Sequence, residues 1–210
     1  MKKIILSLAF LCMVSMSFSQ SFMNGIGVNF MGNTNTIGGT NDFGFGVGIT
    51  YSPRFNFIET NSLSVSAGIP LTVGFNISSS QTEDVYSYYD NVTAGFIINA
   101  PLLISLNMGR GSTKENKNKF GYFVGAGVGY QHGIFASDIY DPFTDTYIES
   151  YSTNTFGPAA NAGVRFGIGR KSKNLELRLS YFTGLKKSEV ISSLYSKRPS
   201  IFGFAVLFNF

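Results

Sequence analysis

The feature that most constrains the fold is a period-two alternation that runs through the chain after about residue 20. In residues 42–52 the odd positions carry Phe, Val, Ile and Tyr, while the even positions between them carry Gly and Thr. Residues 202–210 repeat the pattern, with Phe or Val at every even position. Because successive side chains of a strand point to opposite faces of a sheet, this pattern predicts strands with one large apolar face. After residue 20, no apolar run in the sequence reaches the length of a transmembrane helix.

Eight segments follow this alternation. We predict strands at about 22–32, 42–52, 62–77, 92–108, 120–136, 156–168, 175–185 and 200–210. The connections alternate in character, since long ones rich in Asn, Ser, Thr, Tyr and Asp (33–41, 78–91, 137–155 and 186–199) take turns with generally shorter ones (53–61, 109–119 and 169–174). Such an alternation separates a loop end from a turn end, as in an up-and-down barrel. The predicted fold class is therefore all-β, an eight-stranded antiparallel up-and-down transmembrane β-barrel formed by residues 20–210.

The charged strand residues indicate which face meets lipid. Arg165, Glu176 and Arg178 have the parity of the Gly-rich face, whereas the Phe-rich face carries no charge. With 21 Phe and only 13% charged residues, this apolar face is too large to be exposed to water. We therefore expect the Phe-rich face to contact lipid. The glycines would line a narrow lumen and leave room there for larger inward side chains, of which Phe123, Phe135 and Phe182 are examples.

The first 19 residues have the features of a cleaved signal peptide. Lys2 and Lys3 precede an apolar run over about residues 4–14, and Ser17-Phe18-Ser19 provides a small-x-small cleavage pattern before Gln20. The apolar run is too short to favour a retained membrane anchor. Lipidation of Cys12 is disfavoured because Leu11, which is not a small residue, precedes it. Removal of Lys2 and Lys3 lowers the formal charge from +4 to +2, and the remaining chain has no cysteine for thiol catalysis or disulfides.

The signal peptide, the eight strands and the final strand Phe202-Gly-Phe-Ala-Val-Leu-Phe-Asn-Phe210 together resemble the small outer-membrane β-barrels of Gram-negative bacteria, of the OmpA/OmpX type. The resemblance implies an outer-membrane location, contact with lipid and lipopolysaccharide, and insertion by the barrel-assembly machinery. It also implies that Phe204, Phe208 and Phe210 form the C-terminal signal that this machinery recognises.

The inward charges predict an ion network in the lumen. A hairpin that pairs residue 168 with residue 175 would set Arg165 opposite Arg178, with Glu176 diagonal to Arg165 and Asn107 and Asn161 nearby by parity. We predict that Arg165, Glu176 and Arg178 plug the lumen as a structural network. The alternative is a charged constriction that selects small anions.

Catalysis, cofactors and nucleic-acid binding find little support in the sequence. The single histidine, His132, shares the outward parity of Tyr130 and Ile134, so we expect it in the interfacial belt. Lipid A deacylase barrels place a Ser two residues after such a His, where this chain has Ile134. We therefore predict no enzyme and no cofactor. The acids of 141–145 lack the alternating spacing of a calcium loop, and no basic stripe tracks a nucleic acid.

The loops carry the functional expectation. Loops 78–91 and 137–155 hold seven acidic residues, no base and many tyrosines, whereas loop 186–199 is basic. The opposite charges could pack the loops together or simply keep them solvated, and tyrosine-rich surfaces also suit binding of an unknown surface ligand. We predict a monomeric barrel with a structural or surface-interaction role through its loops. The alternative is a narrow pore or a barrel accessory of a secretion system, of the PorT type.

Overall fold

The computed structural model describes residues 21–37, 40–84, 87–139, 147–169, 173–185, 188–189, 196–197 and 200–210. The predicted signal peptide, residues 1–19, lies outside these residues. No helix long and apolar enough to cross a membrane occurs among the residues described.

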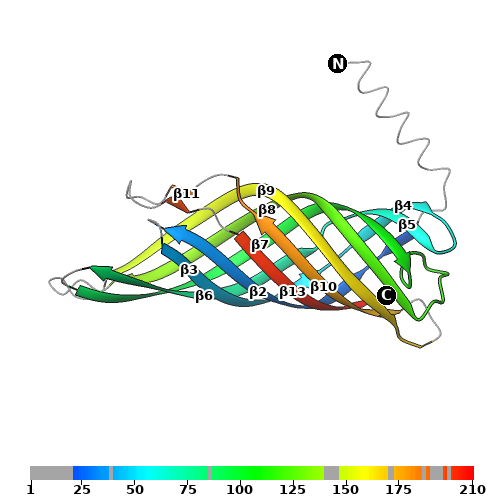
Figure 1. The fold of residues 1–210 in the computed structure, drawn as a ribbon, viewed down its shortest axis with the longest axis horizontal. Helices are drawn as coiled ribbons and strands as arrows, with labels where there is room; N and C mark the ends of the chain where they lie inside the picture. Colours follow the sequence, from blue (N-terminus) through cyan, green and yellow to red (C-terminus); the bar gives the residue numbers. More distant parts are fainter. Residues whose placement is uncertain are drawn as a thin grey trace, which may run out of the picture.

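The described residues form strands that wrap into a closed cylinder (Figure 1). The strands are β1 (Ser21–Met23), β2 (Gly25–Ile37), β3 (Thr40–Tyr51), β4 (Arg54–Glu59), β5 (Leu63–Gly68), β6 (Leu71–Asp84), β7 (Ser87–Gly109), β8 (Phe120–Ile139), β9 (Tyr147–Gly167), β10 (Asn174–Thr183), β11 (Ser188–Glu189), β12 (Ser196–Lys197) and β13 (Ser200–Asn209). All of them except β11 and β12, which pair with each other, belong to one sheet with the order β1-β4-β5-β7-β6-β3-β2-β13-β10-β9-β8, which the β7–β8 pairing closes.

Three of the eight barrel strands are each interrupted once, which is why the main sheet contains eleven strands. We call each complete barrel strand, interrupted or not, a stave. β1 and β2 flank Asn24, β3 and β4 flank Ser52 and Pro53, and β5 and β6 flank Ile69 and Pro70. Proline has no backbone N–H for the ladder, which accounts for two of the breaks. Every pairing is antiparallel, and neighbouring staves are consecutive in the chain. The predicted eight-stranded antiparallel up-and-down transmembrane barrel is confirmed.

The seam between the first and last staves is closed by backbone hydrogen bonds. β13 pairs with β2 from Ser200↔Thr34 to Asn209↔Gly25. Beyond this ladder, the N–H of Asn24 donates to the carbonyl of Phe210 at 3.2 Å, and the N–H of Phe210 donates to the carbonyl of Asn24 at 2.9 Å. Closure leaves no unpaired sheet edge in the middle of the cylinder, as a barrel in lipid requires.

The strands are longer at the loop end than the alternation predicts. The β6–β7 ladder continues to Asp84↔Ser87 and the β8–β9 ladder to Ile139↔Tyr147, so much of the predicted loops 78–91 and 137–155 is strand. The loop predicted at 33–41 is likewise mostly occupied by β2 and β3, and the predicted turn 53–61 contains β4. Hydrophobic alternation reports strands only where one face is in lipid. Beyond that zone both faces are polar and the signal is lost, although the hydrogen bonds continue.

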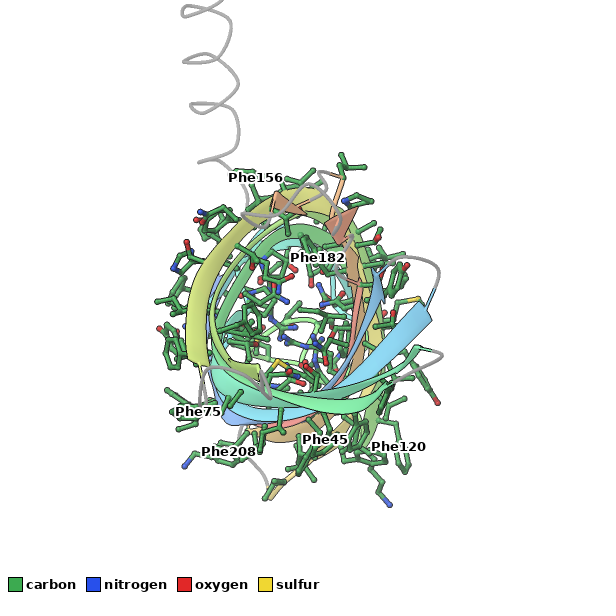
Figure 2. All side chains as sticks on the ribbon, turned by 90° about the vertical axis from the view of Figure 1, so that its left-hand side faces the viewer. Phe45, Phe75, Phe120, Phe156, Phe182 and Phe208 are labelled. Carbon is green, nitrogen blue, oxygen red and sulfur yellow. The ribbon has the colours of Figure 1, made fainter. Side chains whose placement is uncertain are left out.

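The outer surface is an apolar band. Figure 2 looks along the barrel from the loop end and shows Phe45, Phe75, Phe120, Phe156 and Phe208 pointing outward. On β3 the outward side chains are between 44% and 64% exposed, and each is large and uncharged. Aromatic rings pair across strands on this surface, as in Phe120–Phe166 (centroids 5.5 Å apart), Tyr130–Phe156 (4.7 Å) and Tyr181–Phe202 (4.8 Å). An apolar band with aromatic residues towards its rims is the surface that a transmembrane barrel presents to lipid.

The lumen towards the loop end is filled by apolar side chains. Its buried cluster consists of Met31, Ile97, Leu103, Phe135, Ala159, Phe182 and Ile201. Glycines give the rings their space, because a Cβ atom at Gly129 would lie 2.7 Å from the Phe182 ring and one at Gly133 would lie 2.4 Å from the Phe135 ring. Phe182 is the labelled phenylalanine that points inward in Figure 2. The predicted complement of inward glycines and phenylalanines is confirmed.

Candidate functional site

Charged side chains gather in the part of the lumen nearer the turn end. Arg54 comes from β4, Arg165 from β9, and Glu176 and Arg178 from β10. All four are buried, with exposed fractions of 9%, 2%, 1% and 7%. We call these four residues the lumen cluster. The period-two alternation places them inside, because each has the inward parity of its own strand.

The predicted register of the β9–β10 hairpin is wrong by two residues. Arg165 pairs directly with Glu176, and Arg178 pairs with Gly163. The turn closes through the N–H of Ile168, which donates to the carbonyl of Lys173 at 3.0 Å, and Gly169 has a φ of 67°. A shift of two residues keeps every side chain on its predicted face. It replaces two facing arginines with an arginine facing a carboxylate, which is the favourable cross-strand arrangement.

Glu176 accepts hydrogen bonds from two arginines and one amide. Nε of Arg165 donates to Oε2 at 2.6 Å, and Nε of Arg178 donates to Oε1 at 2.7 Å. Nδ2 of Asn209 also donates to Oε2, at 3.0 Å. The sequence analysis named Arg165, Glu176 and Arg178 as one network, and the structure brings all three together through this carboxylate. Asn209 ties the network to the last strand.

Arg54 is a member of the lumen cluster that the sequence analysis missed. Its Nη1 atom donates to Oδ1 of Asn107 at 3.0 Å, and Nη1 of Arg165 donates to the same oxygen at 2.9 Å. The guanidinium of Arg165 also lies over the Phe123 ring, 4.2 Å from its centroid. The alternation of Arg54, Phe55 and Asn56 after Pro53 was the signal for this residue. It was overlooked because residues 53–61 were interpreted as a turn.

The loop between β7 and β8 covers the turn end of the lumen. The carbonyl of Gly111 accepts hydrogen bonds from Nη2 of Arg54 and, at 3.4 Å, from Nη1 of Arg165. The carbonyl of Ser112 accepts one from Nδ2 of Asn56 at 2.8 Å. Gly111 has a φ of 71°, and a Cβ atom there would lie 2.9 Å from Cδ of Arg165. The loop can therefore approach the arginines this closely only with glycine at this position.

Two small cavities remain in the lumen around Arg178. One has a volume of about 20 Å³ and is lined by the three arginines of the lumen cluster, by Ser52, Ser66 and Ser105, and by other inward residues. The second has a volume of about 30 Å³ and lies among Asn29, Thr50, Thr72, Asn99, Ser180 and further side chains. Arg178 and Asn161 line both cavities. Spaces of this size are sufficient for water molecules or a monatomic ion.

The three phenylalanines of the predicted assembly signal all lie on the outer face of β13 or directly after it. Phe204 and Phe210 are 42% and 51% exposed, and the rings of Phe208 and Phe210 stack with their centroids 6.3 Å apart. They form part of the apolar band. Their recognition by the barrel-assembly machinery stays a prediction.

His132 lies on the outer face near the loop end of the apolar band. Its Nδ1 atom is 2.7 Å from Oδ1 of Asn154, which also accepts a hydrogen bond from the Tyr130 hydroxyl at 2.8 Å. Ile134 pairs with Ser152, so Ser152 lies diagonal to His132 on the same face. The alternation along β8 gives no sign of this serine, because Ser152 belongs to the neighbouring strand β9. The structure records no hydrogen bond between these two described residues.

A metal centre finds no support in the described part of the chain. No group of three His, Cys, Asp or Glu side chains that could hold a metal ion occurs among the residues that the structure describes. Asp141 and Asp145, which the sequence analysis weighed as calcium ligands, lie outside the described residues.

No family model and no curated protein matches the sequence. Among solved structures, the fold is similar to Ail, the attachment invasion locus protein of Yersinia pestis, with 12% identity, a TM-score of 0.42, and 90% of this chain and 98% of Ail covered. It is also similar to Neisserial surface protein A, with 11% identity, a TM-score of 0.44, and 90% of this chain and 97% of that protein covered. A third similar structure is the outer membrane protein OprG of Pseudomonas aeruginosa, with 9% identity, a TM-score of 0.47, and 92% and 96% covered. Similarity at these values carries no functional assignment to this chain.

Proposed function

We propose that the chain is a monomeric outer-membrane barrel with a side-chain-filled lumen, and that it acts at the cell surface through the strands and loops of its loop end. The observation that carries the proposal is the division of the barrel along its axis. An apolar band surrounds a lumen that contains many buried side chains, and four strands continue beyond the band as a polar extension (Figure 1). The role in surface interaction rests on that extension.

The geometry of the extension supports an interaction surface. Residues 78–84 of β6 continue past Ile77, which is 62% exposed in the apolar band. At about 3.3 Å per residue this is roughly 20 Å of additional strand. Residues 147–155 of β9 pair with β8 on one side, whereas the β10 ladder on the other side begins only at Ala159↔Phe182. Within the described residues, this edge of β9 therefore offers backbone hydrogen-bonding groups to an extended partner.

The filled lumen supports a structural barrel over the alternative pore. The apolar cluster around Phe182 lies towards one end of the lumen, and the loop carrying Gly111 covers the other. Cavities of about 20 and 30 Å³ lie between them. In planar bilayers we expect no stable conductance from the purified barrel. Stable, anion-selective steps that disappear in Arg165→Ala would overturn the closed lumen and favour the anion-selective constriction.

Orientation and location are tested by site-specific labelling, because the only cysteine of the chain, Cys12, lies in the predicted signal peptide. We expect a membrane-impermeant maleimide to label Thr82→Cys, at the loop end, in intact cells. Lys114→Cys, at the turn end, is the matched control and should react only after the outer membrane is opened. Labelling of Lys114→Cys alone would reverse the orientation, and recovery of both variants in the soluble fraction would contradict the membrane location.

The proposal includes partners for assembly and lipid contact. The outward Phe204, Phe208 and Phe210 would engage the barrel-assembly machinery, and the belt of Tyr130 and His132 would contact lipopolysaccharide at the interface. Phe210→Ala, which keeps the backbone hydrogen bonds to Asn24, should lower the amount of barrel inserted in cells and leave refolding of the purified chain into detergent intact. Equal losses in both assays would show that Phe210 acts through stability and not through recognition.

We include the absence of enzymatic activity in the proposal. His132 has Asn154 within hydrogen-bonding distance of its Nδ1 atom, and Ile134 replaces the serine that a deacylase of the resembled type would carry. Ser152 is the nearest alternative nucleophile by register. Incubation of the refolded barrel with lipid A should release no fatty acid. Release that is lost in both His132→Ala and Ser152→Ala would overturn this part of the proposal.

A further inference from the structure

We propose that the smaller lumen cavity is a binding site for a small monovalent anion of the halide class, enclosed between Arg54, Arg165 and Arg178. The inference does not depend on the proposed surface role, because it concerns the interior of the barrel alone. Three properties of the lumen cluster carry it, namely its charge, the chemistry of the cavity lining, and an arginine nitrogen that lacks a partner.

The lumen cluster has more positive than negative charge. Three buried guanidiniums face one buried carboxylate, which leaves two positive charges uncompensated within the cluster. The next carboxylate is that of Glu59, a half-buried residue near the turn end that accepts a hydrogen bond from Nδ2 of Asn56 at 2.7 Å and does not line the cavity. Unpaired charges are costly to bury in a medium of low dielectric constant. A bound anion would offset this cost.

The lining of the smaller cavity combines positive groups and hydroxyls with two amides, Asn107 and Asn161, and with apolar residues such as Leu103 and Phe123. Its lining includes the three arginines together with Ser52, Ser66 and Ser105, and contains no Asp or Glu. Glu176 lies on the other side of the arginines, where it holds Nε of Arg165 and Nε of Arg178. Hydroxyl and guanidinium groups can both donate hydrogen bonds to a halide. The volume of about 20 Å³ suits a monatomic ion better than phosphate or a carboxylic acid.

One donor in the lining has no protein partner. Arg178 is 93% buried, and its Nε and Nη2 atoms are occupied by Glu176 and Ser52. Its Nη1 atom makes no hydrogen bond, although it is shielded from bulk solvent. Arg178 lines both cavities, as does Asn161, whose Oδ1 atom is also without a hydrogen-bond partner, so an occupant of this space would supply the acceptor that the Arg178 nitrogen lacks. An anion is favoured over a lone water molecule because three guanidiniums surround the smaller cavity.

The occupant is tested by anomalous scattering. The barrel would be refolded into detergent in sodium bromide, so that the ion can enter before the lumen closes, and crystallised in the same salt. We expect a bromine anomalous peak between the guanidiniums of Arg54 and Arg178. A peak confined to the protein surface, or no peak in the lumen, would overturn the proposal and identify the occupant as water.

A solution measurement follows the same site through thermal stability. The melting temperature should be higher in sodium chloride than in sodium gluconate of equal ionic strength, since gluconate is too large for the cavity. Arg54→Gln should raise about tenfold the chloride concentration at which half of the increase in melting temperature is reached, because it removes one charged donor. Equal melting temperatures of the unsubstituted chain in the two salts would contradict the site.

A second variant keeps the test decisive if Arg54→Gln does not fold. Asn161 is 7% exposed and lines both cavities. Asn161→Asp supplies a tethered carboxylate in place of the ion, so it should lose the bromide peak and its melting temperature should no longer depend on chloride.

Asn33→Asp is the matched control, because Asn33 is also a buried amide but forms a hydrogen bond with Asn76 away from both cavities. The control should keep the chloride dependence. Retention of the dependence in Asn161→Asp would exclude the proposed site.

Discussion

The two halves of the lumen hold different kinds of side chain. Towards the turn end, arginines, a carboxylate and amides from β4, β7, β9, β10 and β13 are joined by hydrogen bonds. Towards the loop end, Phe135 and Phe182 pack directly against glycines. The first half relies on charge compensation and directional bonds, whereas the second relies on shape. A substitution should therefore fail for a different reason in each half, and that difference can be measured.

The largest effect is expected from Glu176→Gln in the charged half. The substitution keeps the shape of the side chain but leaves Arg54, Arg165 and Arg178 buried without a carboxylate. Breaking a buried ion pair in this way should cost about 3–5 kcal/mol of unfolding free energy, measured by reversible urea unfolding of the refolded barrel. Glu59→Gln is the control, because Glu59 is only half-buried and should contribute less than about 1 kcal/mol. Similar losses in the two variants would contradict the central role of Glu176.

A slightly smaller effect is expected from Phe182→Ala in the apolar half. Phe182 is 2% exposed and its ring fills the space beside Gly129, so truncation should leave a cavity and cost about 3–4 kcal/mol. Phe45→Ala is the control, because Phe45 is 57% exposed in the lipid-facing band. Its loss should be clearly smaller in the same urea titration. If Phe45→Ala proved as costly as Phe182→Ala, packing inside the loop-end half would not be what stabilises it.

Gly111→Ala examines the contact between the capping loop and the charged half. The substitution meets both a positive φ and a Cβ position 2.9 Å from Cδ of Arg165 and from Nδ2 of Asn174, so we expect a loss of about 2 kcal/mol or more. Gly169→Ala is the matched control, since it has a φ of 67° and nothing within 4 Å of its Cβ position. It should lose only about 1 kcal/mol, the cost of the left-handed backbone. Equal losses would show that the approach to Arg165 is not restrictive.

The two halves also differ in how well the sequence predicts them. Parity alone places Phe123, Phe135, Phe182, Arg165 and Glu176 inside, because a period of two fixes the face of every strand residue. Parity does not fix which residues face each other, since a shift of two residues preserves all faces. The apolar half tolerates this ambiguity, because inward glycines occur on several strands. The charged half does not, and the partner of Arg165 became clear only from the geometry of the Ile168–Lys173 turn.

Arg54 illustrates a second limit of the sequence. The residue follows the Ser52-Pro53 break, which has the appearance of a turn. Its strand pairs with β5 in a local hairpin and with β1 through contacts distant in sequence. Its place in the lumen depends on the continuation of the second stave past a proline. Local propensity favours the opposite interpretation there. The third arginine of the lumen, and with it the second uncompensated positive charge, therefore becomes apparent only in the three-dimensional structure.

The smallest effect is expected outside the lumen, from His132→Phe. The side chain lies on the outer face at the loop-end rim of the apolar band, where an aromatic ring of either kind suits the interface. The exchange removes the contact with Asn154, but the Tyr130 hydroxyl still donates to the same oxygen. The unfolding free energy should therefore change by less than about 0.5 kcal/mol. A loss comparable to that of Phe182→Ala would show that the outer rim, and not the filled lumen, stabilises the loop end of the barrel.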